Sequence, residues 1–266
     1  MDSERQSADQ WLSQFNAFLE GLKRVWPAII EGLTNFAAGY QQYELLKQAG
    51  WVPHATTPAH LIDQCNGDAQ VLSASIEAFY EDNWQSVRRE IEKRVASYLI
   101  DAEAKAAVSE ALSAHGMGLH RLVVRGLFPE VERVARMELY NGAVGNIPAP
   151  DGKGAWPVWN HLIRSADERL SPTQVDPRGF YAFRLFEFFF EHVYAKVDTP
   201  EAQKRFAGDP VPNRHGALHG LVVYRSPKES LNMIFMADFL LHVICLLKEQ
   251  YSERAATAEL RGGGSP

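Results

Sequence analysis

The amino-acid sequence predicts an all-α protein, and three observations support this fold class. Apolar residues recur at three- and four-residue spacing along most of the 266 residues, which is the period of an amphipathic helix. Alternating strand-like segments joined by hairpin turns are scarce, and there is no internal repeat. Hydrophobic residues make up 46% and charged residues 23% of the chain, as in a globular protein with a substantial core.

Charge and composition exclude several classes of protein. The formal net charge of −6 argues against nucleic-acid binding through bulk positive charge, although it is compatible with a local basic site. The apolar run 180–197 is interrupted by charged residues, which argues against a membrane span. The first residues are acidic and polar, unlike a secretory signal, and the chain has only two cysteines, far apart. We therefore expect a soluble, cytoplasmic protein without a membrane partner.

Residues 1–140 are expected to form an N-terminal helical region. Two apolar stripes, over 11–26 and 29–40, predict helices separated at Pro27. Further helices are predicted from Pro58 onward, over 68–98 and over 101–112. These additional helices are candidates for a sensing or regulatory role.

A new helix is predicted to begin at Pro129, because proline suits the first helical position and two glutamates follow it closely. The segment 141–157 then contains four glycines and three prolines, which is typical of a linker or a long loop. It is the predicted boundary before a second helical domain, 158–254. Residues 255–266 form a tail that ends in a linker-like GGGSP.

Two helices are predicted in the second domain from their start signals. An aspartate followed by proline at 176–177 begins a helix to about Val197 that is apolar on nearly all sides, as a central buried helix would be. The Ser-Pro-Lys-Glu sequence at 226–229 is a capping box, so a long helix should run from there to about Tyr251.

Asp238 lies within the apolar pattern of this last helix. An unpaired buried carboxylate is costly, so Asp238 needs a partner. The candidates are His242, four residues further on, or a side chain of a neighbouring helix. A buried structural pair is the favoured interpretation.

The segment 209–224, DPVPNRHGALHGLVVY, carries the candidate chemistry. Two prolines precede Asn213, which is a strong N-cap residue, so Arg214 should open a helix that also contains His219. A helix start offers free N–H groups, a guanidinium binds phosphate oxygens and an imidazole transfers protons near neutral pH. Gly216 and Gly220 should share one face of this helix. Each glycine destabilises a helix by about 1 kcal/mol relative to alanine, so we expect a closely packed neighbour that offsets this cost.

The sequence from Arg214 to His219, RHGALH, resembles the R-x4-6-H motif of the HEPN superfamily. The order of elements over 157–251 is also similar: an apolar helix, a loop, the motif helix and a long final helix. NRHGALHG resembles in particular a group of bacterial HEPN-like proteins. The resemblance implies a HEPN-like helical bundle, preceded here by additional N-terminal helices.

The resemblance further implies a metal-independent endoribonuclease that needs no cofactor and works as a homodimer. The RNA 2′-hydroxyl would attack the adjacent phosphate to leave a 2′,3′-cyclic phosphate, with His219 as general acid/base and Arg214 as phosphate clamp. Such enzymes commonly act as toxins or in antiviral defence by abortive infection, with an antitoxin or a trigger-sensing partner. In many members a polar residue follows the arginine, whereas here His215 follows and Asn213 precedes. Asn213 is therefore assigned to capping, and His215 is a second imidazole.

Other residues are candidates for a supporting role. Tyr224 and Asn232 are candidates to orient the motif histidine. The segment 201–230 carries five basic and three acidic side chains, so it is mildly basic within an acidic chain. Its candidates for binding substrate phosphates are Arg205, Arg225 and Lys228.

Two alternatives to the nuclease remain open. The chain could be a catalytically silent HEPN-like module that dimerises or binds nucleotides or RNA. It could also be a metal-dependent hydrolase, because His215 and His219 have the i, i+4 spacing of two zinc ligands. Against the second alternative, the metalloprotease pattern requires a glutamate where Gly216 stands.

Overall fold

The structure is a computed structural model that describes residues 39, 41–149, 154–158, 160–162, 164 and 188–262, with the backbone alone at 156, 190 and 250–262. Within these residues 69% are helical and almost none are in strands, which confirms the all-α prediction. The predicted stripes over 11–40, apart from the helical residue 39, and most of the predicted helix 176–197 lie outside the described residues.

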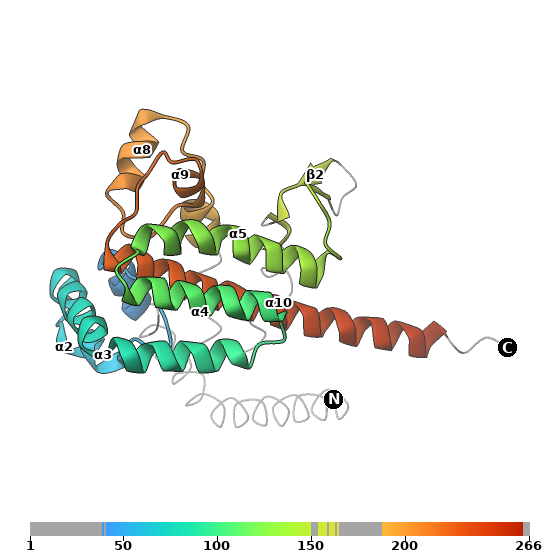
Figure 1. The fold of residues 1–266 in the computed structure, drawn as a ribbon, viewed down its shortest axis with the longest axis horizontal. Coiled ribbons are helices and arrows are strands. Elements are labelled where there is room, and N and C mark those ends of the chain that lie inside the picture. Colours follow the sequence, from blue (N-terminus) through green and yellow to red (C-terminus); the bar gives the residue numbers. More distant parts are fainter. Residues whose placement is uncertain are drawn as a thin grey trace, which may run out of the picture.

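The helices pack around one long C-terminal helix (Figure 1). In that view α10 runs beside α5 and α4, α8 and α9 lie at one end of α5, and the short hairpin lies at the other end. The last turns of α10 extend beyond the other described helices. In chain order the elements are α2 (Ala59–Gln64), α3 (Ala69–Ala96), α4 (Ala102–Gly116), α5 (His120–Leu139), β1 (Ile147–Pro148), β2 (Ala155–Trp156), the π-helical turn η1 (Phe189–Val193), α8 (Pro200–Ala207), α9 (Arg214–Leu218) and α10 (Pro227–Gly262).

The predicted helix starts are confirmed where a capping side chain marks them. The Asp68 carboxylate accepts from the first amides of α3, and the Asp101 carboxylate accepts from Ala104 N at 2.7 Å to start α4. At α10, Glu229 Oε2 accepts from Ser226 N at 2.6 Å, and Glu229 N donates back to Ser226 Oγ at 3.2 Å. This is the capping box that the sequence predicts, and α10 continues past the expected end at Tyr251.

The core centres on the first half of α10, where Met233, Phe235 and Ile244 have no exposed surface. Buried residues on both sides of 141–157 belong to this one core. By length and composition the stretch Pro227–Glu249 could span a membrane, but 83% of its most apolar window is buried within the protein. A central core helix has the same properties, so this feature does not assign the chain to a membrane.

The expected helix start at Pro129 is wrong, because Pro129 lies inside α5. Proline removes one helical hydrogen bond and crowds the carbonyl four residues earlier. Here Pro129 and Arg125 both lie on the exposed face, where carbonyls can tilt toward water. The buried residues Val124 and Phe128, before the proline, continue the apolar stripe that packs against α10. Tertiary packing therefore carries the helix through the proline.

The Gly/Pro-rich segment, predicted as a linker or a long loop, contains two short strands, β1 and β2, that pair antiparallel. The residues before β1 are bound to α5, because Arg136 Nη1 donates to Ala143 O at 2.9 Å and to Gly145 O at 2.5 Å. His161 Nε2 donates to Ile147 O at 3.0 Å. The described part of this segment is thus attached on both sides by side chains.

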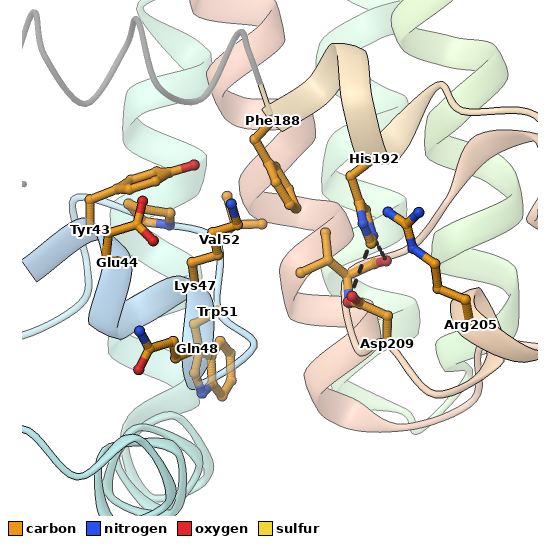
Figure 2. A pocket seen from close by; sticks show the side chains of 12 residues that line it. Tyr43, Glu44, Lys47, Gln48, Trp51, Val52, Phe188, His192, Arg205 and Asp209 are labelled. Atoms are coloured by element: carbon orange, nitrogen blue, oxygen red, sulfur yellow. Dashed lines mark hydrogen bonds and ion pairs between the residues drawn. The ribbon is translucent and has the colours of Figure 1, made fainter. Parts of the chain in front are cut away.

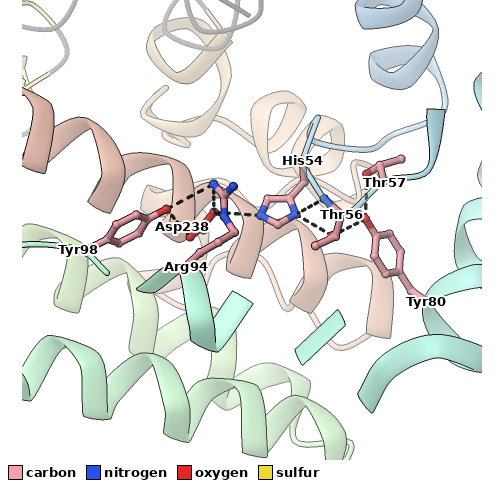
Figure 3. A network of polar contacts seen from close by, with 7 residues as sticks. All are labelled: His54, Thr56, Thr57, Tyr80, Arg94, Tyr98 and Asp238. Atoms are coloured by element: carbon pink, nitrogen blue, oxygen red, sulfur yellow. Dashed lines mark hydrogen bonds and ion pairs between the residues drawn. The ribbon is translucent and has the colours of Figure 1, made fainter. Parts of the chain in front are cut away.

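Asp238 binds neighbouring elements, which is the second of the two predicted arrangements (Figure 3). Asp238 Oδ2 accepts from Arg94 Nη2 at 2.9 Å and from His54 Nε2 at 3.0 Å, and Tyr98 donates to Oδ1 at 2.8 Å. The His242 pairing is wrong: that side chain is exposed, with its ring 5.6 Å from the Tyr98 ring. Burial opposes ionisation, but the bonds and charges of His54 and Arg94 lower the pKa of Asp238. The network joins the 51–57 loop to α3 and α10.

Candidate functional site

The motif segment folds as a short helix whose start was predicted correctly. Asn213 has extended backbone angles, and its Oδ1 accepts from Gly216 N at 2.8 Å, which is an N-cap. The helix α9 has only five residues and packs against α5. Arg214 is its first residue.

His219 is the C-cap of α9, so it lies at the end of the helix and not inside it as expected. Gly220 follows with φ of +68°, a left-handed conformation that glycine adopts without strain and that ends the helix. The expectation that Gly216 and Gly220 share a helix face is therefore wrong. Gly216 does have a close neighbour: an added Cβ would lie 2.9 Å from Val222 Cγ2, in the turn that follows.

The remaining polar atoms of Asn213 are used within the protein. Its Nδ2 donates to His192 O at 2.7 Å and to Ala195 O at 2.9 Å, and its backbone N donates to the Tyr224 hydroxyl at 2.9 Å. The residue is completely buried. Asn213 therefore joins η1 and the chain after it to α9 and does not face a substrate.

Arg214 forms an ion pair with Glu132 of α5, in which Nε lies 2.5 Å from Oε1. The arginine side chain is 26% exposed and the glutamate side chain 17% exposed, so the pair is only partly screened by water. Tyr194 is half-buried close to the pair, and the burial of its hydroxyl and the Glu132 charge raise the pKa of that hydroxyl. Glu132 was not among the predicted site residues, because an acidic residue on an amphipathic helix gives no distinctive signal.

His215 and His219 form a pair of imidazoles at the end of α9, with ring centroids 4.5 Å apart. His219 is exposed, whereas His215 is half-buried. His215 Nδ1 accepts from Val197 N at 3.3 Å, so the neutral ring carries its proton on Nε2. Burial, and then the neighbouring His219 and Arg214, lower the pKa of His215, which keeps it neutral at neutral pH.

Tyr224 and Asn232, the predicted supporting residues, form hydrogen bonds to loops and none to His219 among the described residues. The Tyr224 hydroxyl donates to Phe206 O at 3.4 Å and accepts from Asn213 N. Asn232 Oδ1 accepts from Val52 N at 2.9 Å, and its Nδ2 donates to Gly50 O and Pro210 O. Both residues thus position the chain before α9, which is an indirect role.

The three basic candidates lie in different environments. Lys228 Nζ donates to Ala49 O at 2.7 Å and to Ser73 Oγ at 2.6 Å, and lies 3.4 Å from Glu77, so it stabilises the packing of α10 on α3. Arg225 is exposed beside the capping box. Arg205 lies over the Phe206 ring, 4.9 Å from its centroid.

Arg205 also lines a cavity of about 360 Å³, which Figure 2 shows with His192 and Asp209 on the same side. His192 Nε2 donates to Val211 O at 3.1 Å and lies 3.7 Å from Asp209 Oδ1. Burial lowers the pKa of His192, although Asp209 and Val211 act in the opposite direction. Lys47 lies on the opposite wall. Because Asn213 bonds to His192 O, this cavity and α9 share one supporting residue.

A metal site is not apparent in the part of the chain that the structure describes, where no group of three or more His, Cys, Asp or Glu side chains could hold an ion. The described cysteines, Cys65 and Cys245, are free and buried. The site therefore consists of a guanidinium paired with a carboxylate and two adjacent imidazoles. In comparisons with known proteins, no family model, no curated protein and no solved structure matches this chain.

Proposed function

We propose that the chain is a metal-independent endoribonuclease of the HEPN type, with a HEPN-like bundle and its reacting groups on α9. The observation that supports this proposal is the exposed His219 ring at the C-cap of the five-residue helix that Arg214 begins, with its centroid 4.5 Å from that of the His215 ring. An exposed imidazole at the end of a helix is accessible to an RNA strand, and a second imidazole beside it can donate a hydrogen bond to a phosphate oxygen.

The proposed reaction removes one proton from the attacking 2′-hydroxyl and gives one proton to the leaving 5′ oxygen. His219 takes the proton of the RNA 2′-hydroxyl, whose oxygen attacks the adjacent phosphorus. The bond from phosphorus to the 5′ oxygen breaks, and His219 of the second copy in a homodimer, in its protonated form, gives that oxygen a proton. Arg214 balances the charge of the phosphate, and His215 Nε2–H donates to a non-bridging oxygen. The products are a 2′,3′-cyclic phosphate and a 5′-hydroxyl.

The test is RNA cleavage with EDTA present, followed by analysis of the new RNA ends. Removal of a general acid/base costs about 10²–10⁴-fold in rate, so His219→Ala should lose most activity and Arg214→Ala should lose activity as well. The matched control is His242→Ala, which removes an exposed histidine of α10. A wild-type protein that cuts no RNA, or a His219→Ala variant as active as the wild type, would reject the nuclease.

The Arg214–Glu132 ion pair favours a second candidate, the catalytically silent RNA-binding or dimerising module. A guanidinium that already has a carboxylate partner has less positive charge to offer a phosphate. This module would bind RNA without producing new ends, and binding would not depend on His219. End analysis and a binding measurement on the same samples therefore separate the two functions.

For the nuclease, we propose a toxin or antiviral role, in which expression of wild type but not His219→Ala arrests growth.

A further inference from the structure

The cavity of about 360 Å³ in Figure 2 lies where three segments of the chain meet. Residues 43–53 line one part of it, and residues 188–192 and 205–211 line the rest. Among the described residues that form its wall, none belongs to α9, so the cavity is distinct from the proposed nuclease site. A cavity of this size accommodates a small organic molecule.

The part of the wall at η1 has an unusual backbone. Tyr194 N donates to Phe189 O at 3.1 Å, a hydrogen bond that spans five residues and makes this turn π-helical. Turns of this kind are rare in proteins and are frequent at functional sites. The Phe188 ring, just before the turn, stacks on the His192 ring, with centroids 4.8 Å apart and planes 12° apart. Both residues line the cavity, so η1 supplies it with an aromatic wall.

Apolar side chains form the interior of the cavity beside this wall. Trp51, Val52 and Val211 line it and are 2%, 1% and 4% exposed. A flat apolar group placed between Trp51 and the η1 rings would therefore be removed from water, which is favourable.

Two cations, Lys47 and Arg205, line the same cavity from opposite sides (Figure 2). Their side chains form no ion pair or hydrogen bond in the part of the chain that the structure describes, and Arg205 lies over the Phe206 ring. Burial is the main cause of the lowered pKa of His192, and the charges of Arg205 and Lys47 act in the same direction, so both charges reach one ring of the wall. Cations that face one cavity repel each other, and an anion between them removes this repulsion.

The two acids of the wall limit the charge of such an anion. Asp209 Oδ1 accepts from Val211 N at 2.8 Å and lies 3.7 Å from His192 Nε2, and Glu44 lies on the same side as Lys47. These carboxylates would repel a dianion such as a phosphate monoester more strongly than a single carboxylate. A guanidinium also binds a carboxylate through two parallel hydrogen bonds. The wall therefore favours one negative charge over two.

We propose that this cavity binds an aromatic carboxylate, a small molecule with one negative charge and one flat apolar ring. The carboxylate pairs with Arg205 and Lys47, and the ring lies between Trp51 and the η1 rings. The nuclease proposal is not needed for this inference, because no residue of this wall takes part in the proposed cleavage.

The test is calorimetric titration of the full chain with 3-phenylpropanoate and indole-3-acetate, with the amide of each acid as an uncharged counterpart and with phenyl phosphate as a dianion. We expect at least one carboxylate to bind with saturation and about tenfold or more tightly than its amide. Arg205→Gln and Lys47→Gln should each weaken binding about fivefold or more. The control, Lys204→Gln, removes an exposed positive charge of α8 outside the cavity wall and should leave binding unchanged.

Gln48→Trp gives a second test that keeps both cations. Gln48 is exposed and lines the cavity, so a large ring there should occupy the space of the ligand and weaken binding, while circular dichroism stays that of a folded helical protein. The proposal fails if neither carboxylate binds, if an amide binds as tightly as its acid, or if Arg205→Gln and Lys47→Gln both bind as the wild type does. Tighter binding of phenyl phosphate than of either carboxylate would also reject it.

Discussion

Glu132 of α5 and Arg214 of α9 form an ion pair between residues 82 positions apart in the chain. The pair attaches the motif helix to α5 and at the same time neutralises the residue proposed to hold the RNA phosphate. Binding of a phosphate therefore has to compete with the carboxylate for the guanidinium.

Replacement of Glu132 by Gln should strengthen RNA binding. Loss of the carboxylate leaves Arg214 charged without its acidic partner, so we expect several-fold tighter binding at low salt and a steeper dependence on salt. Fluorescence anisotropy with a labelled RNA at two salt concentrations measures both. Glu130→Gln is the matched control, because it makes the same charge change on α5 but removes a partner of Arg133. Equal effects of the two variants would show that only net charge matters.

Replacement of Asp238 by Asn should destabilise the fold strongly. The change leaves Arg94 and His54 in a buried network without their carboxylate, and loss of one partner of a buried ion pair costs about 3–5 kcal/mol. Urea unfolding followed by circular dichroism measures the free energy. Glu92→Gln removes a partly exposed α3 acid that pairs with Arg88, and should cost less than about 1 kcal/mol. Similar costs for both variants would contradict the structural role of Asp238.

Acidification below neutral pH should destabilise the protein through His115. Burial lowers the pKa of His115 from 6.5 to about 4 in the folded chain, whereas the unfolded chain binds the proton near pH 6.5. The unfolded state therefore binds more protons in this interval. Stability should decrease as the pH falls from about 6.5 to about 4, by up to about 3 kcal/mol.

Urea midpoints measured across this pH interval check the His115 prediction. His115→Gln should flatten the profile, whereas the control His60→Gln, at an exposed residue of α2, should not. A wild-type profile that is flat between pH 6.5 and pH 4 would contradict it.

Two glycines should respond to alanine in opposite directions. At Gly216 the new Cβ would lie 2.9 Å from Val222 Cγ2, so Gly216→Ala should destabilise by about 1–3 kcal/mol. Gly126 lies on the exposed face of α5 with no atom near its Cβ position, so Gly126→Ala should stabilise by about 1 kcal/mol. Thermal unfolding of the two variants gives both signs in one experiment.

Elements marked by local signals could be predicted from the sequence. Asp68, Asp101 and the capping box at Ser226 act within three residues of themselves, so their patterns identify the helix starts directly. The start at Pro129 was wrong because packing against α10 outweighs the cost of a proline within α5. The end of α9 at His219 was missed because Gly220 was read as a helical residue, although its positive φ ends the helix.

The partners of the site residues could not be predicted, because they lie far away in the chain. Glu132 reaches Arg214 from another helix, and His54 reaches Asp238 across 184 positions. Among the described residues, Trp51 Nε1 and Trp84 Nε1 are buried without a hydrogen-bond partner, and scattered tryptophans in a sequence give no sign of this. A sequence without aligned relatives shows which chemical groups are present but not which of them meet.

The side chain of Asn213 stabilises α9, a helix of five residues that would not be stable by itself. An isolated helix of this length melts in water, since it does not recover the entropy of nucleation. Here the first turn of α9 is held by the bond from Gly216 N to Asn213 Oδ1, and the same side chain is fixed by its bonds to His192 O and Ala195 O. In deuterated solvent the Gly216 amide should therefore exchange slowly, as part of one cooperative unit with the chain around His192.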